Sequence, residues 1–166
     1  MPASTASELK VLCLRASVRT LAAAESMTGG RVQAAITAVS GASGFFLGGL
    51  TAYTLDQKVR HLGVKRAAAA KVNSVSADVA TQMARGAARL FGADVAIATT
   101  GYAEPAPEFG VDEPFAHWAI AHRLATRHWR IVTGRVVCPG MTRTEAQEAA
   151  TAAVMVELVA YLNHSA

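Results

Sequence analysis

Positions 26–30 of the chain, Ser-Met-Thr-Gly-Gly, combine two hydroxyls with two adjacent glycines, which are residue types suited to catalysis or to ligand binding. The stretch ends an apolar segment at residues 21–24 and precedes an amphipathic segment, a pattern typical of a strand that runs directly into a helix. Such a junction leaves main-chain N–H groups and the positive end of a helix dipole near one point, where an anion is favoured. The stretch therefore predicts either a site for an anion or an ordinary helix cap.

Lys58 is the second candidate, because the sequence places it in the first turn of a helix that Asp56 is expected to cap and Gly63 to end. The helix dipole disfavours a cation there, so the lysine either points to solvent or has a lowered pKa. A lysine whose pKa falls toward neutrality can take the proton of a serine and make its oxygen nucleophilic. Partial burial is one cause that lowers the pKa in this way.

Other polar residues follow the predicted strands of the same sheet. Tyr53 lies near the end of the strand predicted at residues 45–54, and Thr100 directly follows the strand predicted at residues 93–99. Ligands bind beyond the carboxyl ends of the strands in open α/β sheets. We therefore expect Ser26, Tyr53 and Thr100 to lie together along one rim, at the carboxyl ends of the strands.

The elements that must position these residues are short apolar runs and amphipathic segments in alternation, which is typical of an α/β protein. Helices are predicted at residues 4–17, from the glycine pair to residue 38, from Asp56 to Gly63, from Ser76 to Gly92 and from Thr142 to about Leu162, and strands at residues 19–24, 45–54, 93–99, 115–121 and 129–137. Ser76 is an expected cap, and Thr142 begins a capping box with Glu145. The last two strands are expected to add an antiparallel pair to a mostly parallel sheet. Residues 102–114 form a long irregular loop, either a lid or binding loop or a disordered segment.

The length and composition favour one domain that spans residues 1–166. Hydrophobic residues make up 52% and charged residues only 17% of the chain, which predicts a sparsely charged surface and a homo-oligomer. The net charge of +4 comes from scattered Lys and Arg, so no nucleic-acid partner is expected. A basic pocket for an anion explains the charge equally well.

Cys13 and Cys138 fit a reduced cytoplasmic protein better than a disulfide scaffold. The first ten residues lack the pattern of a signal peptide, and no stretch approaches the roughly 20 apolar residues that span a bilayer. We therefore expect a cytoplasmic protein with no membrane partner. His117, His122 and His128 have no carboxylate at ligand spacing, so no metal site is expected.

A set of short motifs follows in order along the chain: Ala24-Glu-Ser-Met-Thr-Gly-Gly30, Gly41-Ala-Ser43, Gly49-x-x-x-Tyr53, Lys58, Val75-Ser76 and Thr100-Gly101. Together they resemble the carboxyl-terminal domain of the competence/damage-inducible CinA family. The resemblance covers roughly residues 5–162, and the ordered set is far more specific than any one motif.

Stand-alone members of that family are nicotinamide mononucleotide deamidases. The resemblance implies a three-layer α/β/α sandwich that hydrolyses the carboxamide of this nucleotide to the nicotinate form, releasing ammonia without a metal or a cofactor. It makes Ser26 the nucleophile, Lys58 its base and Tyr53 the hydroxyl that supports the pair. The small-molecule nucleotide is expected to contact Thr28, Gly29, Gly30, Thr100, Gly101 and Arg143. The N–H groups at residues 28–30 would hold either a tetrahedral oxyanion or the phosphate.

The chain departs from the family pattern along part of the expected pocket. The departures are Met27 for a cysteine, Glu104 for a glycine in Thr100-Gly-Tyr-Ala-Glu104-Pro105, Pro114-Phe-Ala-His-Trp118 for Pro-Val-Gly-Thr-Val, Met141-Thr142-Arg143 for Gly-Asp-Arg, and Gln147 for an arginine. The altered wall is therefore expected at Glu104, at residues 115–118 and at Gln147. If the substrate's phosphate binds near Glu104, the negative charge of the carboxylate repels the phosphate.

Three interpretations follow from this mixture. The chain is an active amidohydrolase, on the original nucleotide or on an altered amide, because the serine, lysine and tyrosine are kept. Alternatively, it is a non-catalytic protein that binds nucleotides or anions and acts in regulation. In the third interpretation it is an oligomeric structural remnant in which Ser26 is only a cap.

Overall fold

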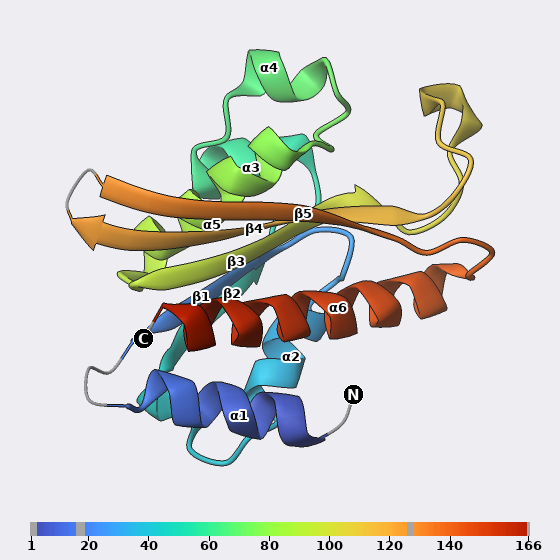
Figure 1. The fold of residues 1–166 in the computed structure, drawn as a ribbon. Coiled ribbons are helices and arrows are strands. Elements are labelled where there is room, and N and C mark those ends of the chain that lie inside the picture. Colours follow the sequence, from blue (N-terminus) through green and yellow to red (C-terminus); the bar gives the residue numbers. More distant parts are fainter. Residues whose placement is uncertain (1–2, 16–18, 126–127, 166) are drawn as a thin grey trace.

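A single mixed sheet organises the chain, of which the computed structural model describes residues 3–15, 19–125 and 128–165 (Figure 1). Its strands are β1 (Leu21–Glu25), β2 (Phe46–Thr51), β3 (Val95–Tyr102), β4 (Phe115–Ala125) and β5 (His128–Val137). They lie in the order β2-β1-β3-β4-β5, with β1 parallel to both of its neighbours and β3, β4 and β5 successively antiparallel. The predicted mixed sheet with an antiparallel strand pair near its C-terminal end is confirmed.

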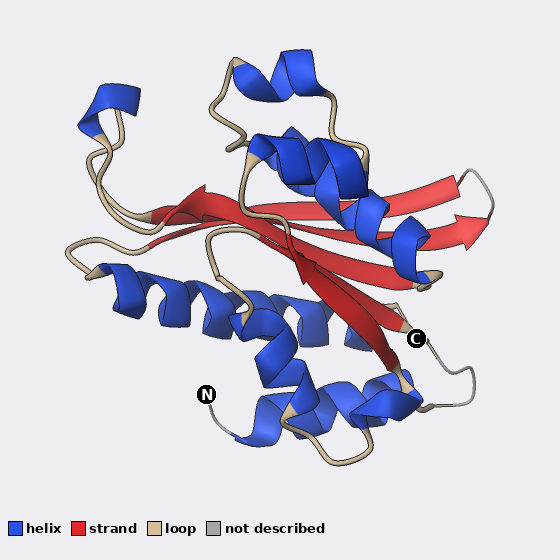
Figure 2. Cartoon of the chain, turned by 180° about the vertical axis from the view of Figure 1, so that it is seen from behind, coloured by secondary structure: helices blue, strands red, loops and turns tan. Residues whose placement is uncertain are grey.

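Helices cover both faces of the sheet and complete the predicted three-layer α/β/α arrangement (Figure 2). One face carries α5 (Ala77–Phe91), against which α3 (Leu55–Leu62) packs. The other face carries α2 (Arg31–Thr37) and α6 (Arg143–His164), and α1 (Ala3–Cys13) lies outside them. No helix of the described ranges is both long and apolar enough to cross a membrane.

The two faces of the central strands carry side chains of different size, because successive residues of a strand point to opposite sides. On the α6 side, β1 and β3 present mainly large residues, among them Leu21, Val95 and Ile97. On the α5 side they present Ala22, Ala24, Ala96 and Ala98. These alanines let α5 lie close to the sheet.

A glycine of α5 then brings α3 close to α5. A Cβ on Gly86 would lie 2.2 Å from the carbonyl oxygen of Leu62, far inside van der Waals contact. The close packing fixes the place of α3, and with it the place of Lys58, relative to the end of β1.

Most of the predicted helix ends are confirmed. Ser76 caps α5 by accepting from the main-chain N–H of Val79 at 3.1 Å, and Thr142 and Glu145 form the predicted capping box. Gly63 ends α3 in the left-handed conformation, with φ of 68°.

The predicted cap of α3 is wrong by two residues. Thr54, with an extended backbone, is the N-cap and accepts from the main-chain N–H of Gln57 at 3.5 Å. Asp56 lies inside the first turn and pairs with Arg66 at 2.6 Å. Threonine is also a common N-cap residue, and here Thr54 begins the helix two residues before Asp56.

Several element boundaries also differ from those predicted. Strand β3 runs past its predicted end at residue 99 and takes in Thr100, Gly101 and Tyr102, because these residues pair with β4. The loop that follows contains a short 3-10 helix, η2 (Pro107–Phe109), and another, η1 (Ala42–Gly44), precedes β2. The short helix α4 (Arg66–Ala70) was not predicted. Part of the predicted helix at residues 4–17 lies outside the described residues, and so do residues 126–127 between β4 and β5.

Both cysteines are buried free thiols. Burial raises the pKa of the Cys13 thiol to about 12 and also raises the pKa of Cys138. These thiols therefore behave as small apolar core residues.

Candidate active site

A cleft of about 570 Å³ opens where β1 and β3 end, at the carboxyl edge of the parallel part of the sheet. Ser26 enters it directly after β1, Lys58 from α3 and Thr100 from β3. Arg143, the first residue of α6, and Glu104, in the loop after β3, also line it. The rim predicted from the ends of the strands is therefore present.

Ser26 and Lys58 form a buried hydrogen-bonded pair in this cleft. The Nζ atom of Lys58 donates to the Oγ atom of Ser26 at 2.9 Å and to the main-chain carbonyl of Tyr53 at 2.9 Å. The lysine is only 2% exposed and the serine only 7%. Of the two orientations left open for Lys58, the one toward solvent is excluded.

Burial lowers the pKa of Lys58 from 10.5 to about 8. The charged amine has lost most of its hydration, and no carboxylate among the described residues forms a salt bridge with it. At pH 7 about a tenth of such lysines are neutral. A neutral amine within hydrogen-bond distance of a serine hydroxyl can accept its proton.

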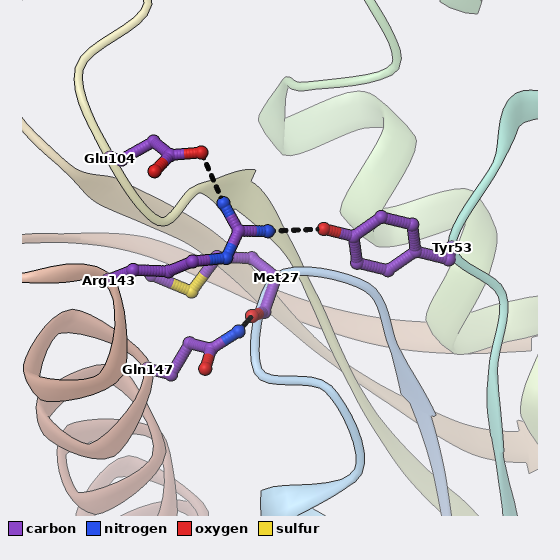
Figure 3. A network of polar contacts seen from close by, with 5 residues as sticks. All are labelled: Met27, Tyr53, Glu104, Arg143 and Gln147. Atoms are coloured by element: carbon purple, nitrogen blue, oxygen red, sulfur yellow. Dashed lines mark hydrogen bonds and ion pairs between the residues drawn. The ribbon is translucent and has the colours of Figure 1, made fainter.

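Tyr53 contributes a different group from the one the sequence predicted. Its main-chain carbonyl holds Lys58, whereas its hydroxyl accepts a hydrogen bond from Nη2 of Arg143 at 2.6 Å (Figure 3). The side chain is 54% exposed at the mouth of the cleft. The pair is therefore supported by the backbone of Tyr53 and not by its hydroxyl.

The glycine turn already contains an anion, the carboxylate of Glu25. This side chain is fully buried, and its Oε2 atom accepts from the main-chain N–H of Gly30 at 2.9 Å and of Val32 at 3.1 Å. Its Oε1 atom accepts from the N–H of Gln33 at 2.9 Å. The prediction that the N–H groups of this turn are free for a ligand is wrong at these positions, because Glu25 takes them.

Thr28, Gly29 and Gly30 consequently do not line the cleft. The hydroxyl of Thr28 is buried and bonds to Glu25 at 2.6 Å and to Thr99 at 2.7 Å. The two glycines have φ of 63° and 97°, so their left-handed backbone shapes the turn. No hydrogen bond among the described residues uses the main-chain N–H of Met27 or of Thr28.

Thr100 and Gly101 line the cleft, but each also has a structural task. The hydroxyl of Thr100 donates to the carbonyl of Ser74 at 2.8 Å. A Cβ on Gly101 would lie 2.1 Å from the carbonyl oxygen of Phe115, so the neighbouring strand requires a glycine there.

Arg143 lies across the mouth of the cleft, between two partners from different elements (Figure 3). Its Nη1 atom donates to the carboxylate of Glu104, and its Nη2 atom donates to Tyr53. The side chains of the ion pair are 44% and 59% exposed. Glu104 thus faces solvent at the rim and is neutralised by the arginine.

The altered wall that the sequence predicted is mostly not part of the cleft. Residues 115–118 line none of it: Phe115 packs on Tyr102 with ring centroids 5.7 Å apart, and Trp118 is buried against Gly134. Gln147 lies behind the turn and donates to the carbonyl of Met27 at 3.0 Å (Figure 3). Of the residues of this predicted wall, Glu104 lines the cleft; Met27, which departs from the family pattern at the turn, lines it as well.

No group of three or more His, Cys, Asp or Glu side chains in the described ranges is arranged to hold a metal ion. The pKa of His117 is lowered by burial and by Arg135, and the pKa of His122 is lowered mainly by burial. His122 bonds to the hydroxyl of Tyr161 at 2.9 Å.

Glu25 is the functional residue that the sequence analysis missed. The available signal was a single acidic residue at the end of an otherwise apolar strand, immediately before the glycine turn. A charge in a buried strand needs partners, and the N–H groups of the following helix are the nearest donors.

The fold and the site define an α/β protein with a serine–lysine pair at the carboxyl edge of the parallel part of a mixed sheet. The chain belongs to the CinA C-terminal domain family, whose pattern it matches over residues 3–162. The family resemblance expected from the motifs is confirmed.

Solved structures of the same family have the same fold. The CinA superfamily protein of Klebsiella pneumoniae is 27% identical with a TM-score of 0.87, over 97% of this chain and 97% of that one. The protein from Enterobacter cloacae is 30% identical with a TM-score of 0.86, over 95% of this chain and 90% of the other. The competence/damage inducible protein of Agrobacterium tumefaciens has a TM-score of 0.81 at 28% identity, with 98% of each chain covered.

Curated relatives match a shorter region. A CinA-like protein of Geobacter sulfurreducens is 51% identical over 86 residues, which are 52% of this chain and 21% of that protein. The chain thus spans less than a quarter of the length of the first such relatives that it matches.

Proposed function

We propose that the chain is an amidohydrolase that converts nicotinamide mononucleotide and water into nicotinate mononucleotide and ammonia. The observation that carries this proposal is the 2.9 Å hydrogen bond between Lys58 and Ser26 in the cleft. A lysine whose pKa is lowered to about 8 has the basicity that serine activation requires.

In the first half of the reaction, the Oγ atom of Ser26 attacks the carboxamide carbon while Lys58 takes the hydroxyl proton. The carbonyl oxygen becomes an oxyanion, and the main-chain N–H of Met27, which lines the cleft and has no partner among the described residues, is the candidate donor to it. Lys58 then gives its proton to the departing nitrogen, so ammonia leaves and a nicotinoyl ester remains on Ser26.

The second half repeats this proton transfer with water. Lys58, neutral again after the first half, takes a proton from a water molecule, and the hydroxide attacks the ester carbonyl. The tetrahedral intermediate collapses, the serine oxygen regains its proton from Lys58, and the nicotinate nucleotide leaves. The backbone carbonyl of Tyr53 holds the lysine in place through both halves.

Ammonia release from nicotinamide mononucleotide tests the proposal. The wild-type chain should turn the nucleotide over, and Ser26→Ala and Lys58→Ala should each lower kcat by at least about a thousandfold. The exposed residues Ser43 and Lys65 provide matched controls, since Ser43→Ala and Lys65→Ala should retain the wild-type rate. Circular dichroism verifies that each variant is folded. Absence of ammonia release by a folded wild-type chain would sink the proposal.

A second candidate function is binding without turnover, in a regulatory role. The observation that favours it is the ion pair between Arg143 and Glu104, which lies across the mouth of the cleft. Under this alternative the wild-type chain binds the nucleotide in isothermal titration calorimetry but releases no ammonia. Ser26→Ala would then leave the Kd for the nucleotide unchanged.

A further inference from the structure

The charged side chains that line the cleft are unequally available to a substrate. Lys58 is buried and hydrogen-bonded to Ser26 and to a backbone carbonyl. Arg143 is therefore the other cation of the lining that an anionic group can reach. It shares the mouth of the cleft with two carboxylates, Glu104 and Glu108.

Both ends of the Arg143 guanidinium are already engaged. Nη1 forms the ion pair with Glu104, and Nη2 donates to the hydroxyl of Tyr53 (Figure 3). A planar guanidinium binds phosphate and carboxylate through the same pair of parallel N–H groups. A substrate phosphate that binds Arg143 through a pair of N–H groups that includes Nη1 competes with Glu104.

We propose that Glu104 is a specificity-determining residue that competes with a substrate's phosphate for Arg143. The cleft therefore selects weakly for phosphorylated amides and accepts the phosphate-free nucleoside amide almost as well. This inference rests on the proposed function for its substrates, while the competition itself concerns phosphate binding alone.

Equilibrium binding measures the competition without turnover. In the Ser26→Ala protein, Glu104→Gln should lower the Kd for nicotinamide mononucleotide and for inorganic phosphate by about fivefold, the upper end of the range for an exposed ion pair. The Kd for nicotinamide riboside, which has no phosphate, should change by less than about twofold. Arg143→Ala should remove the gain, because the contested donors are then gone.

Glu108→Gln is the matched control. Glu108 also lines the cleft and is exposed, but no ion pair joins it to Arg143 among the described side chains. If its replacement strengthens phosphate binding as much as Glu104→Gln does, the effect is one of overall charge and the proposal is overturned. An equal change for the nucleotide and the riboside, or no change for either, also overturns it.

Kinetics separates this inference from the proposed function. In the chain with Ser26 intact, Glu104→Gln should raise kcat/KM for the nucleotide relative to the riboside by about fivefold through KM, with kcat kept. If ammonia is released but this ratio does not move, the inference about Glu104 falls and the proposed function stands. If no ammonia is released but phosphate binding tightens, the proposed function falls and the inference stands.

Discussion

Replacing the buried carboxylate of Glu25 should destabilise the turn that carries Ser26. Glu25→Gln keeps the size of the side chain but exchanges one acceptor oxygen for an NH2 donor. The carboxylate accepts from the N–H groups of Gly30, Val32 and Gln33 and from the hydroxyl of Thr28, so the new donor faces at least one N–H. One charge-assisted bond is lost and the others weaken.

The magnitude follows from the energies of such bonds. A hydrogen bond to a charged group contributes about 1.5 to 3 kcal/mol, and an unsatisfied buried donor costs about 1 to 3 kcal/mol. We expect Glu25→Gln to lower the free energy of unfolding by about 3 kcal/mol, a large part of the stability of a domain of this size.

Urea denaturation followed by far-ultraviolet circular dichroism measures this loss, with exposed Glu157→Gln as the control that should change stability by less than about 0.5 kcal/mol. A second variant, Glu25→Ala, should regain stability in formate or acetate, because either anion supplies the missing acceptor. A loss below about 1 kcal/mol for Glu25→Gln would refute the account of Glu25 as the anion that the turn requires.

Three other residues carry predictions that follow from the geometry: Lys58, Gly101 and Tyr53. Lys58→Met should abolish ammonia release and raise the free energy of unfolding at pH 7 by about 1 kcal/mol in urea titrations, because a buried charge is removed. The pKa of Lys58 is about 8 in the folded chain and 10.5 in the unfolded chain, so the free energy of unfolding of the wild type should rise between pH 8 and 10.5. If Lys58→Met shows the same rise, the assignment of that pKa to Lys58 is contradicted. Gly101→Ala should lower the free energy of unfolding by more than about 2 kcal/mol in the same titrations, because its Cβ would lie 2.1 Å from the carbonyl oxygen of Phe115; an unchanged midpoint would disprove the close approach. Tyr53→Phe should keep kcat for ammonia release within about twofold, because the backbone carbonyl and not the hydroxyl holds Lys58, and a hundredfold loss would restore the hydroxyl to the mechanism.

The parts of the fold that the sequence predicted well depend on local signals. Ser76 and Thr142 begin helices because their side chains satisfy N–H groups only a few residues away. The pairing of Ser26 with Lys58 is not local, and the family resemblance implied it, whereas the strand ends grouped Ser26 with Tyr53 and Thr100. In the structure, Nζ of Lys58 lies within hydrogen-bond distance of Oγ of Ser26.

The features of the site that the sequence predicted poorly depend on the direction in which a side chain points. Tyr53 was placed correctly at the rim, but its hydroxyl turns toward Arg143, which lies 90 residues further along the chain. Phe115 and Trp118 follow a strand pattern, yet the position of β4 in the sheet decides that they pack away from the cleft. Only the assembled sheet determines these directions.

The anion site shows the same limit more sharply. A strand, a glycine pair and a helix start predict a cluster of donors, and that cluster is present. Spacing alone does not say whether the anion comes from a ligand or from the chain. Here Glu25 supplies it, and Arg143 at the mouth of the cleft becomes the candidate for an external anion.

The pH dependence of ammonia release tests the central claim, that Lys58 is the base for Ser26. With nicotinamide mononucleotide as substrate, kcat/KM should rise tenfold per pH unit below about pH 8 and level off above it, following the pKa of Lys58. A profile that stays flat between pH 6.5 and 9, the range in which a base with this pKa loses its proton, would contradict the claim.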